Sequence, residues 1–257
     1  MNDSTSQSPR FAIVAALTEE VSHILEHMHS RSCERIAGRD YWSATYRGHE
    51  LIIVLCGIGK VAAAITATAL IERFGVQEIL FTGVAGAVGE SVSVGDVVIG
   101  EQFIQHDMDA SPLFARYLVP GYADVHFNAS TTMSKRLRLA STKVLSQLGQ
   151  LISPEIVNRF SLQKAQVHAG LVLSGDQFVC DDGVRAQLRQ AHARALVVEM
   201  EGAAVAQVCK DYAVSFALMR TVSDAAGEHA AKDFTAFLHA VASRYSALIV
   251  EAYLDGN

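Results

Sequence analysis

Two carboxylates, Glu199 and Glu201, stand where the sequence predicts that an apolar strand ends and a helix begins. The run AHARALVV before them has the length of a short buried strand, and Gly202–Lys210 after them is rich in Ala and Val without Pro, as in a helix packed on a sheet. Ligands of open α/β sheets bind at the carboxyl ends of strands. An isolated acid at such a junction more often caps the helix or interacts with its dipole, but a second acid two residues away favours a functional site.

The same pattern recurs at two other predicted strands. Glu20 follows the apolar run Phe11–Leu17, in the first turn of a predicted helix, where contact with the helix dipole would by itself explain it. Asp224 follows the strand Ser215–Val222, which carries Arg220 near its end. A buried arginine needs an anionic partner, and the candidates are Glu20 and Glu201. Acids behind three strands, with an arginine beside them, suit a site that uses one base, one acid and one clamp for hydroxyl groups.

Two turns of small residues follow strands and could bring backbone amides close to a ligand. The first reads G-x-G-x-x-A, a dinucleotide-binding fingerprint formed by Gly57, Gly59 and Ala62. That fingerprint needs an acid at the end of the next strand, and Glu78–Thr82 runs into Gly83 instead, which argues against a Rossmann dehydrogenase. Lys60 is not followed by Ser or Thr, so this is no Walker loop, and Lys60 is expected simply at the surface. The second turn, Gly83–Ala87, could enclose the same ligand.

Three further segments have two explanations each. His106–Asp109 contains one His and two Asp, but without a second clear His the spacing favours a loop hydrogen-bond network or a subunit contact over a metal site. The aromatic, Pro-bearing loop Ser111–Tyr122 suits a pocket wall or an interface. Phe178 ends a turn where a flat ligand could stack, although core packing is the more common role of such a ring.

The composition indicates a globular protein that acts on small molecules. The chain has 257 residues, 50% hydrophobic and 19% charged, enough for one large core. The net charge of −6 without clustered Lys and Arg argues against nucleic acid as a partner. No apolar run approaches the length of a membrane span, so we expect a soluble, cytoplasmic protein with reduced and mostly buried thiols at Cys33, Cys56, Cys180 and Cys209.

The order of the predicted elements indicates one α/β domain. About eight strands alternate with about six helices after a polar tail, Met1–Arg10, that we expect to be disordered. The predicted strands are Phe11–Leu17, Tyr41–Tyr46, Leu51–Cys56, Glu78–Thr82, Val94–Ile99, Gln166–Leu173, AHARALVV and Ser215–Val222. The clearest predicted helices are Glu19–Met28, Val61–Phe74, Thr131–Leu148, Gly202–Lys210 and Lys232–Leu254.

Seven motifs in this order resemble the 5′-methylthioadenosine/S-adenosylhomocysteine nucleosidases of the purine and uridine phosphorylase superfamily. They are ALTEEV around Glu20, CGIGKVAAA around Gly57, TGVAGA from Thr82, VGDVVI from Val94, SGDQF from Ser174, VEMEGAAVA around Glu201 and RTVSDAA from Arg220. The resemblance runs from Phe11 to about Leu254. It implies a nucleoside phosphorylase-like catalytic domain over residues 11–257, with a central mixed β-sheet, partly barrel-like, flanked by helices.

The resemblance also implies hydrolysis of the N-glycosidic bond, without a cofactor or metal. Glu20 would activate the water, with Arg220 helping to position it, and Glu201 would bind the ribose 2′- and 3′-hydroxyls. Asp224, supported by Ser223, would protonate adenine N7. Because a carboxyl must be protonated to donate, we expect a raised pKa for Asp224.

For the substrate pocket, the resemblance implies that Phe178 and Met200 sandwich the base and ribose, and that Val179 presents backbone groups to adenine. Ile58, Leu17 and Val84 would also contact the substrate; Val84 stands where some nucleosidases carry Ser. The neighbouring subunit of a homodimer would complete the 5′ pocket, through Leu113, Phe114 and Pro120.

Two other functions remain open as alternatives. Phosphorylases of the superfamily typically carry a Ser after the first glycine turn and an Arg just before the second, and here these places read Gly59-Lys60-Val61 and Phe81-Thr82-Gly83. Water is therefore the favoured nucleophile. A noncatalytic nucleoside-binding or storage protein is disfavoured because the acids and the arginine are intact.

Overall fold

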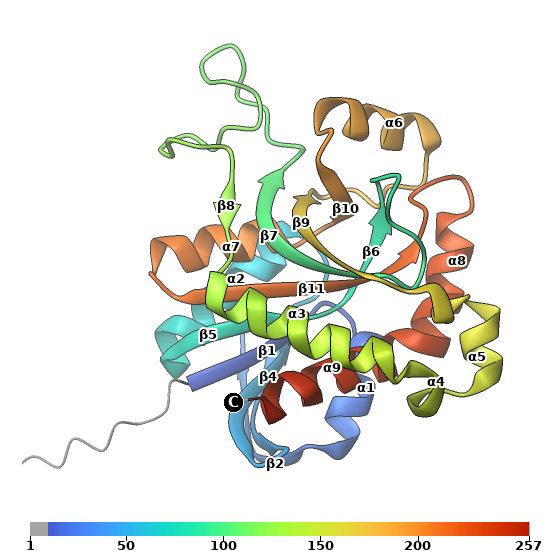
Figure 1. The fold of residues 1–257 in the computed structure, drawn as a ribbon. Helices are drawn as coiled ribbons and strands as arrows, with labels where there is room; N and C mark the ends of the chain where they lie inside the picture. The colour runs from blue at the N-terminus through green and yellow to red at the C-terminus, as the bar shows by residue number, and fades with distance from the viewer. Residues whose placement is uncertain (1–9, 257) are drawn as a thin grey trace, which may run out of the picture.

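The computed structural model describes residues 10–256, and one eleven-stranded mixed sheet runs through them (Figure 1). The strand order is β2-β3-β4-β1-β5-β11-β6-β10-β9-β7-β8. The bounds are β1 (Arg10–Ala15), β2 (His29–Ile36), β3 (Arg39–Tyr46), β4 (His49–Leu55), β5 (Val76–Phe81), β6 (Val84–Ala87), β7 (Val97–Gln105), β8 (Phe127–Asn128), β9 (Val167–Ser174), β10 (Ala195–Glu199) and β11 (Ser215–Asp224).

Part of the sheet closes into a barrel, because β11 also pairs with β7. The ring β11-β6-β10-β9-β7 therefore has five strands, which confirms the predicted partly barrel-like sheet. On the open side, β1 lies between β4 and β5 and is parallel to both. Both faces of a central parallel strand are buried, which explains the unbroken apolar sequence from Phe11 onward.

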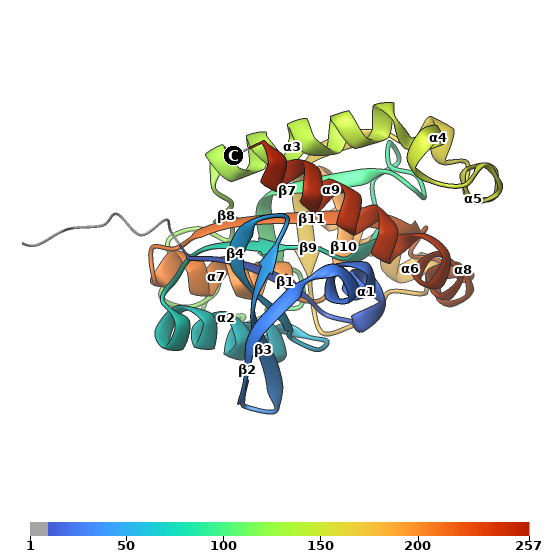
Figure 2. The same ribbon diagram turned by 90° about the horizontal axis from the view of Figure 1, so that it is seen from below.

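Helices cover both faces of the sheet. α2 and α7 pack together on one face, and α1, α3 and α9 on the other (Figure 2). Their bounds are α1 (Thr18–His27), α2 (Lys60–Phe74), α3 (Thr131–Ser146), α4 (Leu148–Leu151), α5 (Pro154–Arg159), α6 (Asp182–Ala191), α7 (Gly202–Asp211), α8 (Ala230–Phe237) and α9 (Ser243–Asp255), with a 3₁₀ turn at Leu162–Lys164. Within residues 10–256, no helix combines the length and apolar character needed to cross a membrane.

Several predicted elements were wrong in their type or limits. The predicted turn Gly83–Ala87 is mostly strand β6, because its small residues pair with β11 and β10 inside the barrel. The single helix predicted over Lys232–Leu254 is α8 and α9 joined by a π turn, Leu238–Ala242. Arg10, predicted as the end of the tail, begins β1, and residues 1–9 lie outside the described part of the chain.

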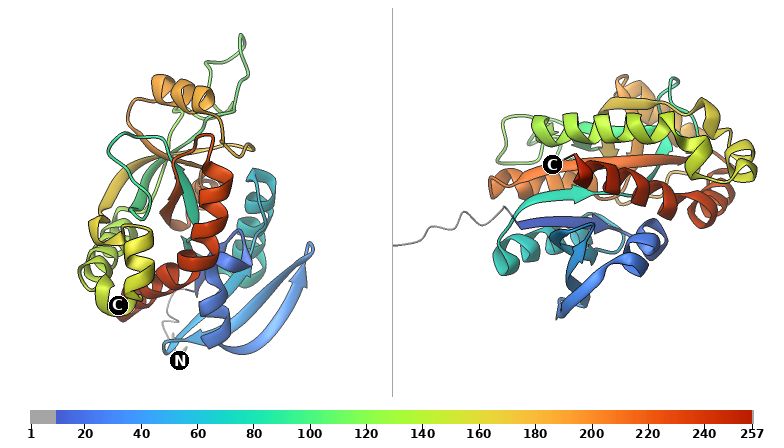
Figure 3. Two further views of the ribbon diagram at one scale, coloured as in Figure 1. Left: turned by 90° about the vertical axis from the view of Figure 1, so that its right-hand side faces the viewer. Right: turned by 60° about the horizontal axis from the view of Figure 1, so that its bottom comes forward.

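Other elements were missed because their sequences do not alternate as expected. β2 is polar and largely exposed, since it is the edge strand of a hairpin with β3 (blue in Figure 3). β8 has two residues, and α4, α5 and α6 are short or polar. The prediction of mostly buried thiols holds only for Cys56 and Cys209, since Cys33 and Cys180 are exposed.

Candidate active site

A cavity of about 90 Å³ lies among the carboxyl ends of β1, β10 and β11 and beside β6. The structure brings nine of the predicted site residues to its wall: Leu17, Glu20, Ile58, Val84, Phe178, Met200, Glu201, Ser223 and Asp224. It adds six residues to which the sequence had assigned no individual role in the pocket: Ala16, Ala85, Gly86, Val198, Glu199 and Phe234. Four carboxylates therefore meet at one small cavity.

Glu20 is held at the cavity by backbone amides. It lies in the first turn of α1 and is 3% exposed. One carboxylate oxygen accepts hydrogen bonds from the amides of Ala16 and Leu17, both at 2.9 Å, and the other accepts from the amide of Val84 at 3.1 Å. Burial raises the pKa of Glu20, while the charge of Arg220 and these amides oppose the rise. Glu20 thus caps its own helix, as its first-turn position allowed, and also faces the cavity.

Arg220 lies behind the cavity wall and is 1% exposed. Its Nη2 donates to Glu199 at 2.5 Å and to Glu201 at 3.3 Å, and its guanidinium lies 4.3 Å from the centre of the Phe81 ring. The predicted partner Glu201 is therefore present, but Glu199 makes the shorter contact. The other predicted partner, Glu20, makes no ion pair with Arg220 within the described residues.

Glu199 ties the end of β10 to the start of α7. It accepts hydrogen bonds from the amides of Glu201 and Gly202 and from the hydroxyl of Ser174, in addition to its ion pair with Arg220. The capping role that the sequence allowed for an acid at this junction is therefore the role of Glu199. Its ion pair could not be anticipated, because β6 separates β10 from β11 in the sheet.

Gly83 has no side chain, so the side chains of Glu20 and Arg220 can both lie close to its Cα atom. A Cβ atom at Gly83 would lie 2.5 Å from Arg220 Nη1 and 2.6 Å from Glu20 Oε1, too close for any side chain. Arg220 Nη1 is buried and has no hydrogen-bond partner within the described residues. Arg220 Nε is likewise buried without a hydrogen-bond partner among these residues, so the guanidinium acts on Glu20 through its charge.

Glu201 is fixed from two sides. One oxygen accepts the amide of Gly59 at 2.9 Å, and the other faces Arg220. Burial and the neighbouring charge of Glu199 raise its pKa to about 8, and Arg220 offsets only part of this. The glycines that resembled a dinucleotide fingerprint therefore serve here to present a backbone amide to a carboxylate.

A polar clasp formed by Lys60, Asp107 and Asp176 holds that glycine turn. Lys60 Nζ donates to Asp107 at 2.6 Å, the Asp176 amide donates to the other oxygen of Asp107 at 2.9 Å, and the Lys60 amide donates to Asp176 at 2.8 Å. The prediction that Lys60 is simply a surface residue was wrong. The preference for a hydrogen-bond network over a metal site at His106–Asp109 agrees with these bonds.

Asp224 occupies a different environment at the other end of the cavity. It is 2% exposed, and it accepts hydrogen bonds from the Ser223 hydroxyl and the Ala226 amide, both at 2.8 Å. Burial raises the pKa of Asp224, as expected from the sequence, and the two hydrogen bonds oppose the rise. A buried carboxyl of this kind can hold a proton and donate it.

Apolar side chains supply the rest of the wall. Phe178 is 42% exposed and packs edge to face on Phe234, with ring centres 5.5 Å apart, so it is not a core residue. Sites for small ligands commonly measure about 300 Å³ or more. The cavity of about 90 Å³ is smaller than that.

Four predicted site residues lie away from this wall. Val179 is buried in a separate apolar cluster with Val198 and Leu173. Leu113, Phe114 and Pro120 lie on the loop between β7 and β8 and are exposed, Leu113 by 84%. Within one copy of the chain they do not contribute to the cavity.

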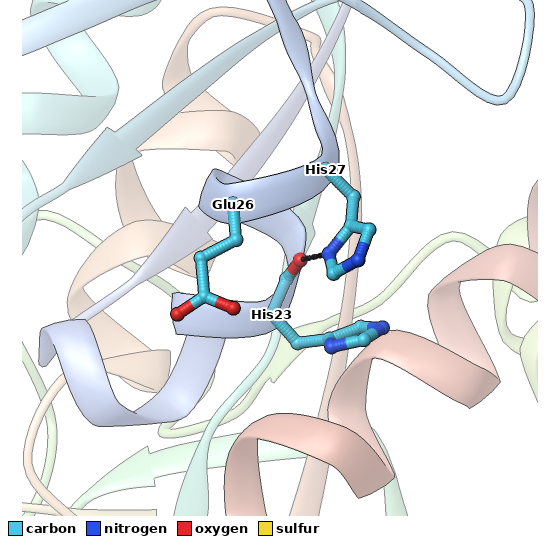
Figure 4. A group of neighbouring side chains, drawn as sticks. All are labelled: His23, Glu26 and His27. Atoms are coloured by element: carbon cyan, nitrogen blue, oxygen red, sulfur yellow. Dashed lines mark hydrogen bonds between the residues drawn. The ribbon is translucent and has the colours of Figure 1, made fainter.

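One group of potential metal ligands occurs in the described residues, and it lies on α1 outside the cavity (Figure 4). It consists of His23, Glu26 and His27. Arg244 approaches His23 Nε2 at 2.6 Å, and His27 Nδ1 bonds the His23 carbonyl at 2.7 Å. Arg244 thus occupies one of the two ring nitrogens of His23.

Buried carboxylates at the strand ends of an α/β sheet have the layout of an enzyme active site, and comparisons with known proteins identify the family. A sequence profile of the phosphorylase superfamily matches residues 10–255, so the chain belongs to this superfamily. It is 34% identical, over 94% of its length and 97% of the relative, to a 5′-methylthioadenosine/S-adenosylhomocysteine nucleosidase of Tolumonas auensis. It is 32% identical, over 89% of its length and 91% of the relative, to an aminodeoxyfutalosine nucleosidase of Campylobacter jejuni.

A solved structure supports the same family assignment. The 5′-methylthioadenosine/S-adenosylhomocysteine nucleosidase of S. pneumoniae, in complex with a transition-state inhibitor, superposes with a TM-score of 0.81 at 30% identity. The match covers 95% of this chain and 98% of that one.

Proposed function

We propose that this protein hydrolyses the N-glycosidic bond of 5′-methylthioadenosine and S-adenosylhomocysteine, releasing adenine and the 5-thio-substituted ribose. The observation that carries the proposal is the meeting of Glu20, Glu201 and Asp224 around one cavity. The relatives named for this reaction support the choice of substrate.

Asp224 is proposed as the general acid. Adenine is a poor leaving group as an anion, so a proton delivered to N7 while the bond breaks lets it leave neutral. Burial raises the pKa of Asp224, which favours the protonated form that can donate. Ser223 and the Ala226 amide fix the orientation of the carboxyl.

Glu20 is proposed as the base that activates water. Its raised pKa gives it affinity for the water's proton, and the nearby charge of Arg220 prevents the pKa from rising further. The ribosyl fragment gains positive charge as the bond breaks, as in glycoside hydrolysis, and the surrounding carboxylates stabilise that charge most strongly at the transition state.

Glu201 is proposed to bind the ribose hydroxyls, which would replace water on its oxygens. Phe178 and Met200 would then contact the base and ribose, with Leu17, Ile58 and Val84 along the sugar side.

Water is favoured over phosphate as the nucleophile because the cavity wall has four carboxylates and, among the described residues, no Lys or Arg. A phosphate dianion would meet repulsion there. The test is adenine release from methylthioadenosine by the purified protein, with and without added phosphate. Rapid release without phosphate is expected; release only with phosphate would mean a phosphorylase, and tight binding without release would mean a noncatalytic nucleoside-binding protein.

A homodimer in the cytoplasm is also proposed. Ile58, just before α2, and Val61 and Ile65, in its first turns, are 57%, 70% and 41% exposed. The exposed loop carrying Leu113 and Phe114 is a second apolar surface. Such patches mark interaction sites, and the loop of a second copy could complete the 5′ side of the cavity. Light scattering tests this, since an active monomer would refute it.

A further inference from the structure

A second hollow, of about 550 Å³, adjoins the cavity and shares Ala16 and Leu17 with it. Strand register explains its place. Tyr41 of β3 pairs with Val54 of β4, so β3 begins beside the carboxyl end of β4. That end leads into Ile58 of the cavity wall through Gly57, which also lines the hollow. The β2–β3 turn thus stands at the same sheet edge as the catalytic carboxylates.

The hollow is lined by charges of both signs. Arg39 donates through Nε to the Cys56 carbonyl at 2.7 Å and through Nη1 to the Ala37 carbonyl at 2.8 Å. These bonds anchor the guanidinium beside the cavity entrance and use two of its five N–H donors. Glu19, in the first turn of α1, lies on another side of the hollow.

The other two charges of the hollow already form a pair. Arg35 donates to Asp40 at 2.9 Å, which leaves Arg39 as the cation and Glu19 as the anion without a salt bridge in the described residues. Trp42 adds an apolar surface that a carbon chain could cross. Separated opposite charges beside an apolar stem complement an amino-acid zwitterion at the end of a short thioether.

We propose that this hollow binds the amino-acid end of a 5′-homocysteinyl substituent, with its carboxylate on Arg39, its ammonium at Glu19 and its thioether chain over Leu17. The inference rests on the proposed nucleosidase function and extends it to substrate preference. Hydrogen bonds between charged groups are about twice as strong as neutral ones. The methyl group of methylthioadenosine carries neither charge, so the hollow would add affinity for S-adenosylhomocysteine and not for methylthioadenosine.

The test compares kcat/KM for the two substrates in the wild type and in Arg39→Met. We expect about a tenfold loss for S-adenosylhomocysteine, mainly as a raised KM, and less than about a twofold change for methylthioadenosine. Arg39→Lys should restore part of the loss because it keeps the charge. The control is Arg73→Met, which removes an exposed arginine paired with Glu34 away from both cavities.

A substrate analogue that carries only one of the two charges tests Arg39 and Glu19 separately. The 5′-(3-aminopropyl)thio nucleoside keeps the ammonium but lacks the carboxylate, so Arg39→Met should leave its turnover unchanged, whereas Glu19→Gln should weaken both it and S-adenosylhomocysteine. Equal losses on both natural substrates would make Arg39 a support of the Cys56–Gly57 backbone and overturn the inference, as would no loss on either. A wild type inactive on both substrates would instead overturn the proposed function, and the inference with it.

Discussion

The two ends of the cavity hold buried carboxylates in contrasting surroundings. At one end Glu20, Glu199 and Glu201 surround a single buried cation, Arg220. At the other end Asp224 is bonded by a hydroxyl and an amide, and the groups that shift its pKa include no cation. Burial raises the pKa of each catalytic candidate, but only the first end has a positive charge to oppose it.

This difference separates the chemical roles. Burial without a nearby cation favours the protonated form of Asp224, which suits an acid, whereas the charge of Arg220 favours the ionised forms of Glu20 and Glu201, which suit a base and a hydroxyl acceptor. Three glutamates therefore lie close to one arginine. Glu199 takes the shorter ion pair, and Glu201 has a pKa near 8.

The largest expected effect comes from Asp224→Asn, which removes the acid but keeps the size of the side chain. Turnover of methylthioadenosine should fall roughly 10²–10⁴-fold, the usual contribution of general acid catalysis, while the protein still folds and binds the nucleoside. Steady-state adenine release measures this. The matched control is Asp255→Asn, at an exposed acid that pairs with Arg47, and near-normal turnover by Asp224→Asn would remove Asp224 as the acid.

Glu20→Gln should also reduce turnover by roughly 10²-fold or more, because an amide cannot accept the proton of water. The same assay applies, with Glu26→Gln as the control, since Glu26 is an exposed acid of the same helix that lines neither the cavity nor the hollow and should leave methylthioadenosine turnover unchanged. If the two variants behaved alike, the base would have to lie elsewhere.

Arg220→Met removes the buried cation beside the three glutamates, and its effect should appear in the stability of the protein. Removing one partner of a buried ion pair typically costs about 3–5 kcal/mol in free energy of unfolding, because the other charge stays buried and unpaired. Urea denaturation at neutral pH measures this, with exposed Arg73→Met as control. An unchanged midpoint would show that the glutamates do not depend on Arg220.

The smallest expected effect is a change in how stability depends on pH. A carboxyl whose pKa is raised by folding contributes stability that is complete below its unfolded pKa and is lost as pH rises through its folded pKa. For Glu201 these limits are the model-peptide value of 4.5 and about 8. Thermal unfolding should thus show the wild type losing stability relative to Glu201→Gln between these pH values; parallel curves for the two proteins would contradict the raised pKa.

The sequence located the catalytic candidates because strand-end acids follow from local patterns. Apolar runs of strand length precede Glu20, Glu201 and Asp224, and parallel strands bring such ends together. The ion pair between Arg220 and Glu199 depends on the order of the strands in the sheet, which local sequence patterns do not contain. Phe234 was missed because one aromatic residue on an amphipathic helix gives no sign of facing Phe178, and β6 because Gly and Ala favour strands weakly.

The central claim is that the end of the cavity without a cation protonates the leaving group. Its most direct test is turnover by Asp224→Asn of the p-nitrophenyl glycoside of 5-methylthioribose. Cleavage of its glycosidic bond releases nitrophenolate, which leaves without a proton. The account predicts that this variant cleaves the nitrophenyl substrate at close to the wild-type rate while failing on methylthioadenosine, and that Glu20→Gln fails on both. Equal losses of Asp224→Asn on the two substrates would contradict it.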